Sequence, residues 1–292
     1  MKIAFHLGAH CTDDDKLARS LLKNDARLRE YGVVCVRPRR FRTIIRDTTL
    51  ELRGTVADAE TQERVIDAML GDEHAERMIL SFQNFICGPG RVFDDGDLYA
   101  KGGFKARWLA DIFPDHQPEF FIAIRNPATF VPALFDTLPR GTTYDALMQG
   151  VDPLDIRWSP VIARIMQENP GAPVTVWCNE DTPFVWPEIL REISDLDASV
   201  PLEGNFDIIE TIMSPEGYER MQSYLATRPP ANEAQRRRVL SAFLDKFALD
   251  DELEDEIDLP GWTPELLDEL TDVYDEDFEQ IARMPGVNVI AA

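Results

Sequence analysis

The sequence predicts an α/β protein with a mainly parallel β-sheet that is covered by helices on both faces. Three observations lead to this prediction. Short apolar runs recur along the first two hundred or so residues of the chain. Segments with helical spacing of apolar residues separate these runs, as crossover helices separate parallel strands. Several runs also end directly in polar residues, and the carboxyl ends of parallel strands are where such sheets bind ligands.

The apolar runs define the expected strands. In chain order they cover residues 3–7, 33–36, 78–81, 119–124 and 174–177. Each run is short, apolar and followed by a polar segment or a loop, which is the pattern of a strand buried on both faces.

Helices are expected between these strands. The segment Thr12-Asp13-Asp14-Asp15 is interpreted as a helix start, because Thr12 and Asp15 have the spacing of a capping box and acids fill the first turn. Further helices are expected at about 61–70, 104–113, 157–167 and 184–193.

The carboxy-terminal part is expected to differ from the rest. Strand patterns fade there, whereas Asn232 is suited to cap one helix and Thr263 with Pro264 to begin another. No linker rich in Gly, Ser or Pro precedes it. We therefore expect an α/β core over residues 1–200 and an acidic helical extension over residues 201–292 that packs on the same domain.

Composition narrows the partners that are expected. Asp and Glu outnumber Lys and Arg by 53 to 30, for a net charge of −23. Such a field repels nucleic acid phosphates and anionic membrane surfaces, so we expect no nucleic acid and no membrane as partner. No apolar run approaches the roughly 20 residues that cross a bilayer, and the first residues lack a signal-peptide pattern. The expected location is cytoplasmic.

Neither a disulfide framework nor a structural zinc site is expected. The chain has four widely spaced cysteines without a CxxC pair: Cys11, Cys35, Cys87 and Cys178. An alternative is a metal site formed by His6, His10, Cys11 and Asp13, since imidazole, thiolate and carboxylate are suitable ligands. Their spacing matches no established metal motif, and we assign no metal.

Three polar segments that follow expected strands carry a resemblance to a known family. They are His6-Leu7-Gly8-Ala9-His10-Cys11-Thr12-Asp13-Asp14-Asp15, Arg125-Asn126-Pro127 and Asn179-Glu180-Asp181. In order and spacing they resemble the phosphosulfate loop, the R-[DN]-P strand end and the Y-E-D turn of the sulfotransferases, which share a P-loop fold. Ser81 and Asn84 fall where many members read S-x-E-N. The resemblance covers about the first 195 residues, and it implies that Arg125 grips the 3′-phosphate of the sulfate donor.

The loop departs from the family pattern where the chemistry would lie. Bacterial members typically read H-I-G-x-x-K-T-G-T-T. Here Cys11 stands at the lysine, Asp13 at the glycine, and Asp14 and Asp15 at the hydroxyl positions. A lysine neutralises the charge that develops in transfer, and a glycine lets backbone N–H groups approach the anion. Ala133 also replaces the usual serine, and the late R-K-G-x-x-G stretch is not evident. We therefore do not expect ordinary use of the sulfate donor.

The candidate ligand-binding residues are the polar side chains of these segments. They are His10, Cys11, Thr12, Asp13, Asp14, Asn84, Arg125, Asn126, Asn179 and Glu180. We expect His10, Asn84, Arg125 and Asn179 to converge in one cleft at strand carboxyl ends. No catalytic residue or cofactor follows from the sequence.

A dense basic segment gives a further candidate. It contains Arg37, Arg39, Arg40, Arg42 and Arg46. One interpretation is a solvated loop that pairs with nearby acids. The other is a clamp for an anionic ligand, because the guanidinium fork matches phosphate and carboxylate.

Three functions are compatible with the sequence. The leading one is a catalytically degenerate, sulfotransferase-like protein, a pseudoenzyme that binds a small anionic ligand or a protein partner. The second is an active sulfotransferase or related transferase with altered chemistry, in which His10 or Asp14 acts as base. The third is an interaction module whose acidic carboxy-terminal helices contact a basic partner. Fold alone does not decide among them.

Overall fold

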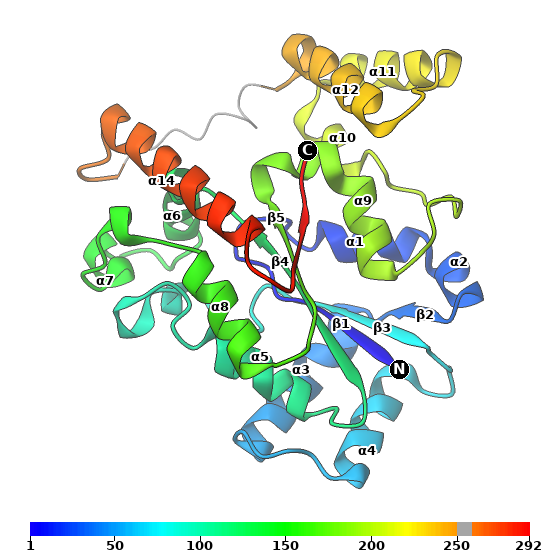
Figure 1. The fold of residues 1–292 in the computed structure, drawn as a ribbon, viewed down its shortest axis with the longest axis vertical. Coiled ribbons are helices and arrows are strands. Elements are labelled where there is room, and N and C mark those ends of the chain that lie inside the picture. The colour runs from blue at the N-terminus through cyan, green and yellow to red at the C-terminus, as the bar shows by residue number, and fades with distance from the viewer. Residues whose placement is uncertain (250–258) are drawn as a thin grey trace.

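The structure is a computed structural model that describes residues 1–249 and 259–292. Its centre is a six-stranded sheet with the order β2-β3-β1-β4-β5-β6, and every neighbouring pair is parallel (Figure 1). The strands are β1 Lys2–His6, β2 Val33–Cys35, β3 Arg77–Ser81, β4 Gln117–Ile124, β5 Val174–Cys178 and β6 Val287–Ile290. The predicted fold class, a mainly parallel sheet between helices, is confirmed.

Helices cover both faces of the sheet because its strands are apolar on both. Successive residues of a strand point to opposite faces, so Phe5 packs in one apolar cluster and Ala4 in the other. The first cluster involves α3 Pro38–Leu52, α4 Ala59–Leu70, α5 Gly102–Asp111, α6 Pro127–Asp136 and α8 Ser159–Glu168. The second involves α1 Lys16–Lys23, α2 Asp25–Glu30, α9 Thr182–Ser194 and α10 Asp207–Ile212. Short helices α7 Tyr144–Met148, η1 Pro89–Arg91, η2 Asp94–Gly96, η3 Pro153–Asp155 and η4 Asn179–Asp181 lie in the connections.

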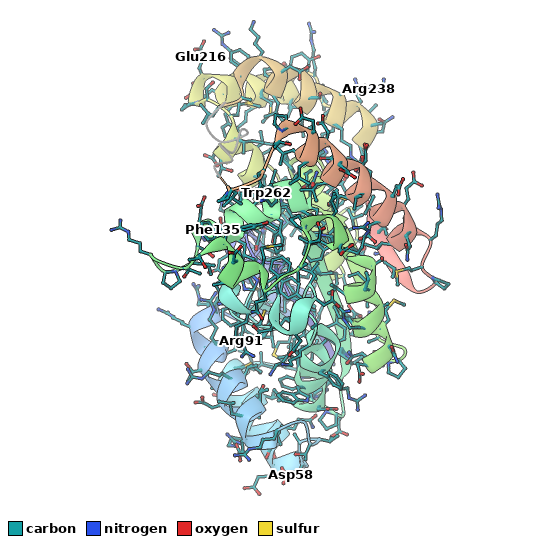
Figure 2. The ribbon with its side chains drawn as sticks, turned by 90° about the vertical axis from the view of Figure 1, so that its left-hand side faces the viewer. Asp58, Arg91, Phe135, Glu216, Arg238 and Trp262 are labelled. Atoms are coloured by element: carbon teal, nitrogen blue, oxygen red, sulfur yellow. The ribbon has the colours of Figure 1, made fainter. Side chains whose placement is uncertain are left out.

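The carboxy-terminal part contains helices and one strand. Helices α11 Pro215–Thr227 and α12 Glu233–Phe247 form a pair with a small apolar cluster of its own. This pair, with Glu216 and Arg238, lies at the opposite end of the molecule from Asp58 at the start of α4 (Figure 2). Helix α14 Pro264–Ala282 returns to pack on α6 and α8.

Strand β6 differs from the expectation of a purely helical carboxy-terminal part. It pairs in parallel with β5, so that Asn288 lies opposite Thr175. The segment is only four residues long and its Val287 and Val289 are half-buried. Its edge position leaves one side of it unpaired in the described sheet, so it lacks the fully apolar pattern of the inner strands.

The capping-box interpretation of the first helix is wrong. Helix α1 begins at Lys16, and the residue before it, Asp15, has a left-handed backbone and no side-chain cap. The Thr12 hydroxyl donates to the Ala9 carbonyl at 2.9 Å instead. The reason is that the Asp13 carboxylate accepts the hydrogen bond from the Leu17 N–H at the start of the helix, whereas the Asp15 carboxylate pairs with Arg42.

No helix within residues 1–249 and 259–292 combines the length and the apolar character needed to cross a membrane.

Candidate functional site

The loop after β1 is fixed against β4 at the carboxyl edge of the sheet. The Ala9 N–H donates to the Ala123 carbonyl at 2.9 Å, and the Ala123 N–H donates to the Gly8 carbonyl at 2.7 Å. Gly8 has a φ of +103°, and a side chain there would meet the Gln83 backbone at 3.1 Å. Glycine is therefore required at this turn.

Asp13 supplies an anion to the start of α1. Its side chain is buried, and its Oδ2 accepts a hydrogen bond from the Leu17 N–H at 2.9 Å. Its carbonyl accepts from the Lys16 N–H at 2.8 Å. The first N–H groups of a helix have no partner within the helix and attract negative charge. At this helix the chain's own carboxylate takes the place that a bound phosphate takes in many other proteins.

His10 is held in a closed hydrogen-bonded chain. Its Nε2 lies 2.8 Å from Asn84 Oδ1 and its Nδ1 lies 2.6 Å from the Tyr99 hydroxyl. The same hydroxyl accepts from the His10 backbone N–H at 3.2 Å. These contacts fit a neutral ring that donates to Asn84 and accepts from Tyr99. Burial lowers the pKa of His10 and raises the pKa of Tyr99 well above its usual value. Both ring nitrogens are engaged, which is unlike a general base awaiting a substrate proton.

Arg125 joins the end of β4 to the loop. Its Nη1 donates to the Cys11 carbonyl at 2.7 Å, and its Nε donates to the Thr129 hydroxyl at 2.9 Å. The structure thus brings His10 to Asn84 and Arg125 to Cys11 at the carboxyl edge. Asp14 is exposed, and its carbonyl accepts from Arg19.

Asn126 and Glu180 hold helix α14 in place. Glu180 Oε1 accepts from the Asn126 N–H at 2.8 Å, and its Oε2 accepts from the Tyr274 hydroxyl at 3.0 Å. Asn126 Nδ2 donates to Thr271 at 2.9 Å. Two of the candidate ligand-binding side chains therefore contact α14. Asn179 begins η4, and its carbonyl accepts from the backbone N–H that ends this turn.

The side chains of the alternative metal site are engaged separately. His6 Nδ1 lies 2.8 Å from the Ser81 hydroxyl, and the His6 ring stacks on Trp177 with centroids 5.7 Å apart. His10 contacts Asn84 and Tyr99 instead. Within residues 1–249 and 259–292, no three His, Cys, Asp or Glu side chains form a group that could hold a metal ion.

A basic cleft of about 400 Å³ lies beside Asn84, between α3, the segment after β3, and α5. Its cationic lining residues are Arg42, Arg46, Arg91 and Lys105, and no Asp or Glu is among its lining side chains in the described chain. Arg42 donates to both oxygens of Asp15, at 2.8 and 3.0 Å, and lies 4.3 Å from the Phe82 ring centre.

The basic segment is helical and not a loop, whereas its use as a clamp for an anionic ligand stays a prediction. Pro38 begins α3, so Arg39, Arg40, Arg42 and Arg46 lie on a helix, because proline is favoured at the first helical position. Of these, Arg42 and Arg46 line the cleft. The sequence did not indicate Arg91 or Lys105, which lie on other elements far along the chain.

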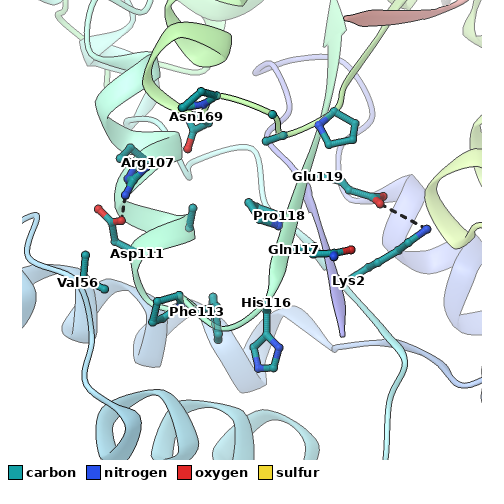
Figure 3. A pocket seen from close by; sticks show the side chains of 16 residues that line it. Lys2, Val56, Arg107, Asp111, Phe113, His116, Gln117, Pro118, Glu119 and Asn169 are labelled. Atoms are coloured by element: carbon teal, nitrogen blue, oxygen red, sulfur yellow. Dashed lines mark hydrogen bonds and ion pairs between the residues drawn. The ribbon is translucent and has the colours of Figure 1, made fainter.

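A larger cavity of about 700 Å³ lies at the opposite, amino edge of the sheet (Figure 3). Its charged side chains are paired within the wall, since Arg107 Nε lies 2.7 Å from Asp111 and Lys2 Nζ lies 3.8 Å from Glu119. Open α/β sheets bind ligands at the carboxyl ends of their strands. The candidate site is therefore the cleft beside Asn84.

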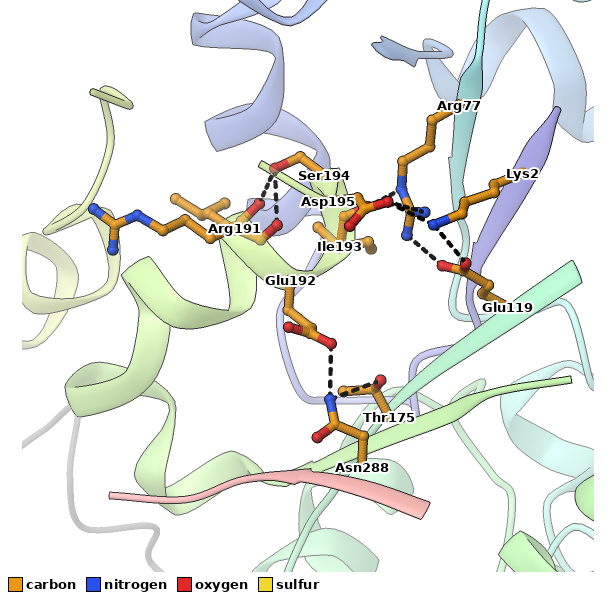
Figure 4. Close-up of polar contacts among 11 residues, drawn as sticks. Lys2, Arg77, Glu119, Thr175, Arg191, Glu192, Ile193, Ser194, Asp195 and Asn288 are labelled. Carbon is orange, nitrogen blue, oxygen red and sulfur yellow. Dashed lines mark hydrogen bonds and ion pairs between the residues drawn. The ribbon is translucent and has the colours of Figure 1, made fainter. Parts of the chain in front are cut away.

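The amino edge beside this cavity is closed by a polar network (Figure 4). Arg77, whose side chain is buried, donates to Glu119 at 2.6 Å and to the Ile193 carbonyl at 2.7 Å. Lys2 donates to Asp195 at 2.7 Å. These contacts fix the end of α9 to the start of the sheet.

Comparison with solved structures finds a likeness to the crystal structure of a sulfotransferase from Alicyclobacillus acidocaldarius. The TM-score is 0.40 and the sequence identity 13%, over 82% of this chain and 97% of that one. No protein-family model matches the chain, and no curated protein is significantly similar to it in sequence.

Proposed function

We propose that this sulfotransferase-like protein binds a small anionic ligand at the carboxyl edge of its sheet and does not transfer sulfuryl groups from the nucleotide donor. The observation that carries the proposal is the placement of charge at this edge. In the loop after β1, the Asp13 carboxylate accepts a hydrogen bond from the Leu17 N–H of α1. The neighbouring cleft, in contrast, is lined by four cationic side chains.

The loop is unsuited to the sulfate donor. A phosphate about 4 Å from the Asp13 carboxylate would be repelled by up to about 4 kcal/mol at an effective dielectric constant near 20. Cys11 offers no positive charge at the position of the family's lysine. Arg125, whose counterpart grips the 3′-phosphate, contacts the Cys11 carbonyl and Thr129. These contacts support an account in which the loop is structural.

The cleft is suited to an anion. The protein carries a net charge of −23, yet the cleft gathers cations and its lining holds no carboxylate in the described chain. Arg46 and Arg91 pair with Asp47 and Asp94, whereas Lys105 has no ion pair in the parts of the chain that the structure describes. An anion is the ligand class that such a lining favours.

The two other readings receive less support. The engaged nitrogens of His10 do not favour its use as a transferase base. A basic partner for the acidic carboxy-terminal helices stays a prediction, and no contact in the described residues favours it over the cleft.

Thermal melts at fixed ionic strength test the proposal. 3′-Phosphoadenosine 5′-phosphate should leave the midpoint unchanged, whereas at least one anion from a panel of sulfate, phosphate, carboxylates and sulfonates should raise it, because a ligand of the native state stabilises that state. Lys105→Met should abolish this rise. Micromolar binding of the nucleotide would contradict the first half, and no response to any anion would contradict the second.

A further inference from the structure

We propose that the cleft beside Asn84 binds an amphipathic anion, in which a carboxylate, sulfonate or phosphate group is attached to an apolar body. This inference rests on the proposed function, and it names the class of ligand.

Lys105 is the side chain that we expect to contact the anionic group of such a ligand. Lys105 is half-buried on α5, and its Nζ lies 4.1 Å from the centre of the Trp108 ring. Burial, together with the nearby Arg91 and Lys101, lowers the pKa of Lys105. A partly buried ammonium without an ion pair is unfavourable, and a bound anion relieves that cost.

Asn84 gives the anion a second donor. Its Oδ1 accepts from His10, so its Nδ2 group is the part of the amide left for a ligand. No residue in the described chain takes a hydrogen bond from Nδ2. The chain Tyr99–His10–Asn84 fixes the amide in this orientation, which makes His10 a positioning residue.

The remaining walls of the cleft are apolar. Buried Ile45, Phe85, Ile86 and Leu109 line it. Leu50, which also lines the cleft, is 64% exposed. A hydrated inorganic ion leaves these side chains uncovered, whereas an apolar body removes them from water.

The size of the cleft agrees with this class. Its volume of about 400 Å³ falls within the roughly 300–1,000 Å³ of pockets that hold small organic ligands. The Arg42 guanidinium lies 4.3 Å from the centre of the Phe82 ring, and both residues line the cleft with Asn84, so a cation and an aromatic ring adjoin there. A two-ring aromatic anion is therefore a suitable probe.

Calorimetry with three probes tests the inference at fixed ionic strength. The probes are naphthalene-2-sulfonate, inorganic sulfate, and neutral naphthalene-2-methanol. We expect the sulfonate to bind at least about tenfold more tightly than either of the others. We also expect Lys105→Met to weaken the binding of the sulfonate by about tenfold or more, because a hydrogen bond between charged groups typically contributes at least that much to affinity.

Lys246→Met is the matched control. It removes the same charge from an exposed position on α12, at the far end of the molecule from α3 and α5 (Figure 1). Its affinity for the sulfonate should equal that of the parent, and thermal melts should show that both variants fold.

The outcomes separate the two proposals. If inorganic sulfate binds as tightly as the sulfonate and Lys105→Met weakens both, anion binding stands and the amphipathic class is wrong. If the neutral probe binds as tightly as the sulfonate, or the two lysine variants behave alike, the cleft does not recognise anions and both proposals fail. Absence of binding by all three probes at millimolar concentration also overturns both.

Discussion

The carboxylate of Asp13 accepts a hydrogen bond from the backbone N–H of Leu17 at 2.9 Å. Asp13 is 5% exposed, so this is a buried anion at a helix start and not a solvated one. Its two neighbours differ. Asp15 pairs with Arg42, and Asp14 is exposed without a side-chain contact in the described chain. Three consecutive aspartates therefore have three different roles, which a set of single substitutions can separate.

Loss of the Asp13 carboxylate should lower stability. Asp13→Ala removes the acceptor of the Leu17 N–H, so we expect the free energy of unfolding to fall by about 1 kcal/mol, within the range of about 0.5–2 for a lost helix cap. Asp13→Asn keeps an oxygen acceptor and should cost less. Urea denaturation at constant pH and salt measures both changes.

Asp14→Asn is the control for this prediction, because asparagine tolerates the left-handed backbone of Asp14, whose φ is 48°. It removes the same charge from the same loop, but its side chain is exposed, and the change should stay within about 0.5 kcal/mol. Equal losses of stability on substitution of Asp13 and of Asp14 would show that the negative charge of Asp13 stabilises the protein and that its hydrogen bond with Leu17 adds nothing.

Introducing the lysine and glycine of the sulfotransferase loop pattern should create an anion site in the loop. Cys11→Lys combined with Asp13→Gly changes the local charge by two units and frees the Leu17 N–H, so sulfate or phosphate binding should become detectable by calorimetry. A variant with Glu60→Gln and Glu63→Gln changes net charge equally at exposed positions on α4. Sulfate binding by this control, or none by the loop variant, would contradict the account of the loop.

The fold was predictable because the inner strands are buried on both faces. Such strands read as continuous apolar runs, and residues 78–81 or 119–124 are recognisable without any partner. Strand β6 was missed because it lies at the sheet edge and has exposed Asn288 in its centre. The start of α1 was misread because Asp13, Asp14 and Asp15 look alike in sequence, and only tertiary contacts tell them apart.

The candidate site was predictable only in part. His10 and Asn84 each follow a predicted strand, which led us to expect them close together, and their side chains are in contact. The same reasoning selected Asn126 and Glu180, whose partners Thr271 and Tyr274 come from a helix about 90 residues or more further along the chain. No local pattern marks Lys105 as a neighbour of Asn84. Burial and charge pairing between distant elements decide these roles, and a single sequence does not display them.

Two buried histidines should make stability depend on pH. Burial lowers the pKa of His6 and of His10 below the ordinary histidine value of 6.5. The unfolded chain then binds protons that the folded protein does not. Stability is therefore fully present above about pH 6.5 and falls as the pH drops from there towards the folded pKa values, by at most about 1.4 kcal/mol per pH unit for each histidine.

Substitution of the histidines isolates this effect. His6→Gln and His10→Gln should each flatten the fall in unfolding free energy between about pH 6.5 and 5, whatever their effect at neutral pH. His74→Gln, at an exposed position, controls for the loss of an imidazole. Urea titrations at several pH values give the slopes. Unchanged slopes in both buried variants would show that His6 and His10 are not the groups responsible.

Asp277 should be a main attachment of α14 to the rest of the molecule. Its carboxylate, 4% exposed, accepts hydrogen bonds from the backbone N–H groups of Trp158 at 2.5 Å and Ser159 at 3.1 Å, so a residue near the carboxyl end caps the start of α8. Asp277→Ala leaves these buried N–H groups unpaired and should lower the free energy of unfolding by about 1–3 kcal/mol. Asp275→Ala removes the same charge from the exposed side of the same helix and should have little effect. Urea denaturation followed by tryptophan fluorescence compares the two, and a loss at Asp275 as large as that at Asp277 would show that the acidic helix is held by its charge in general and not by this cap.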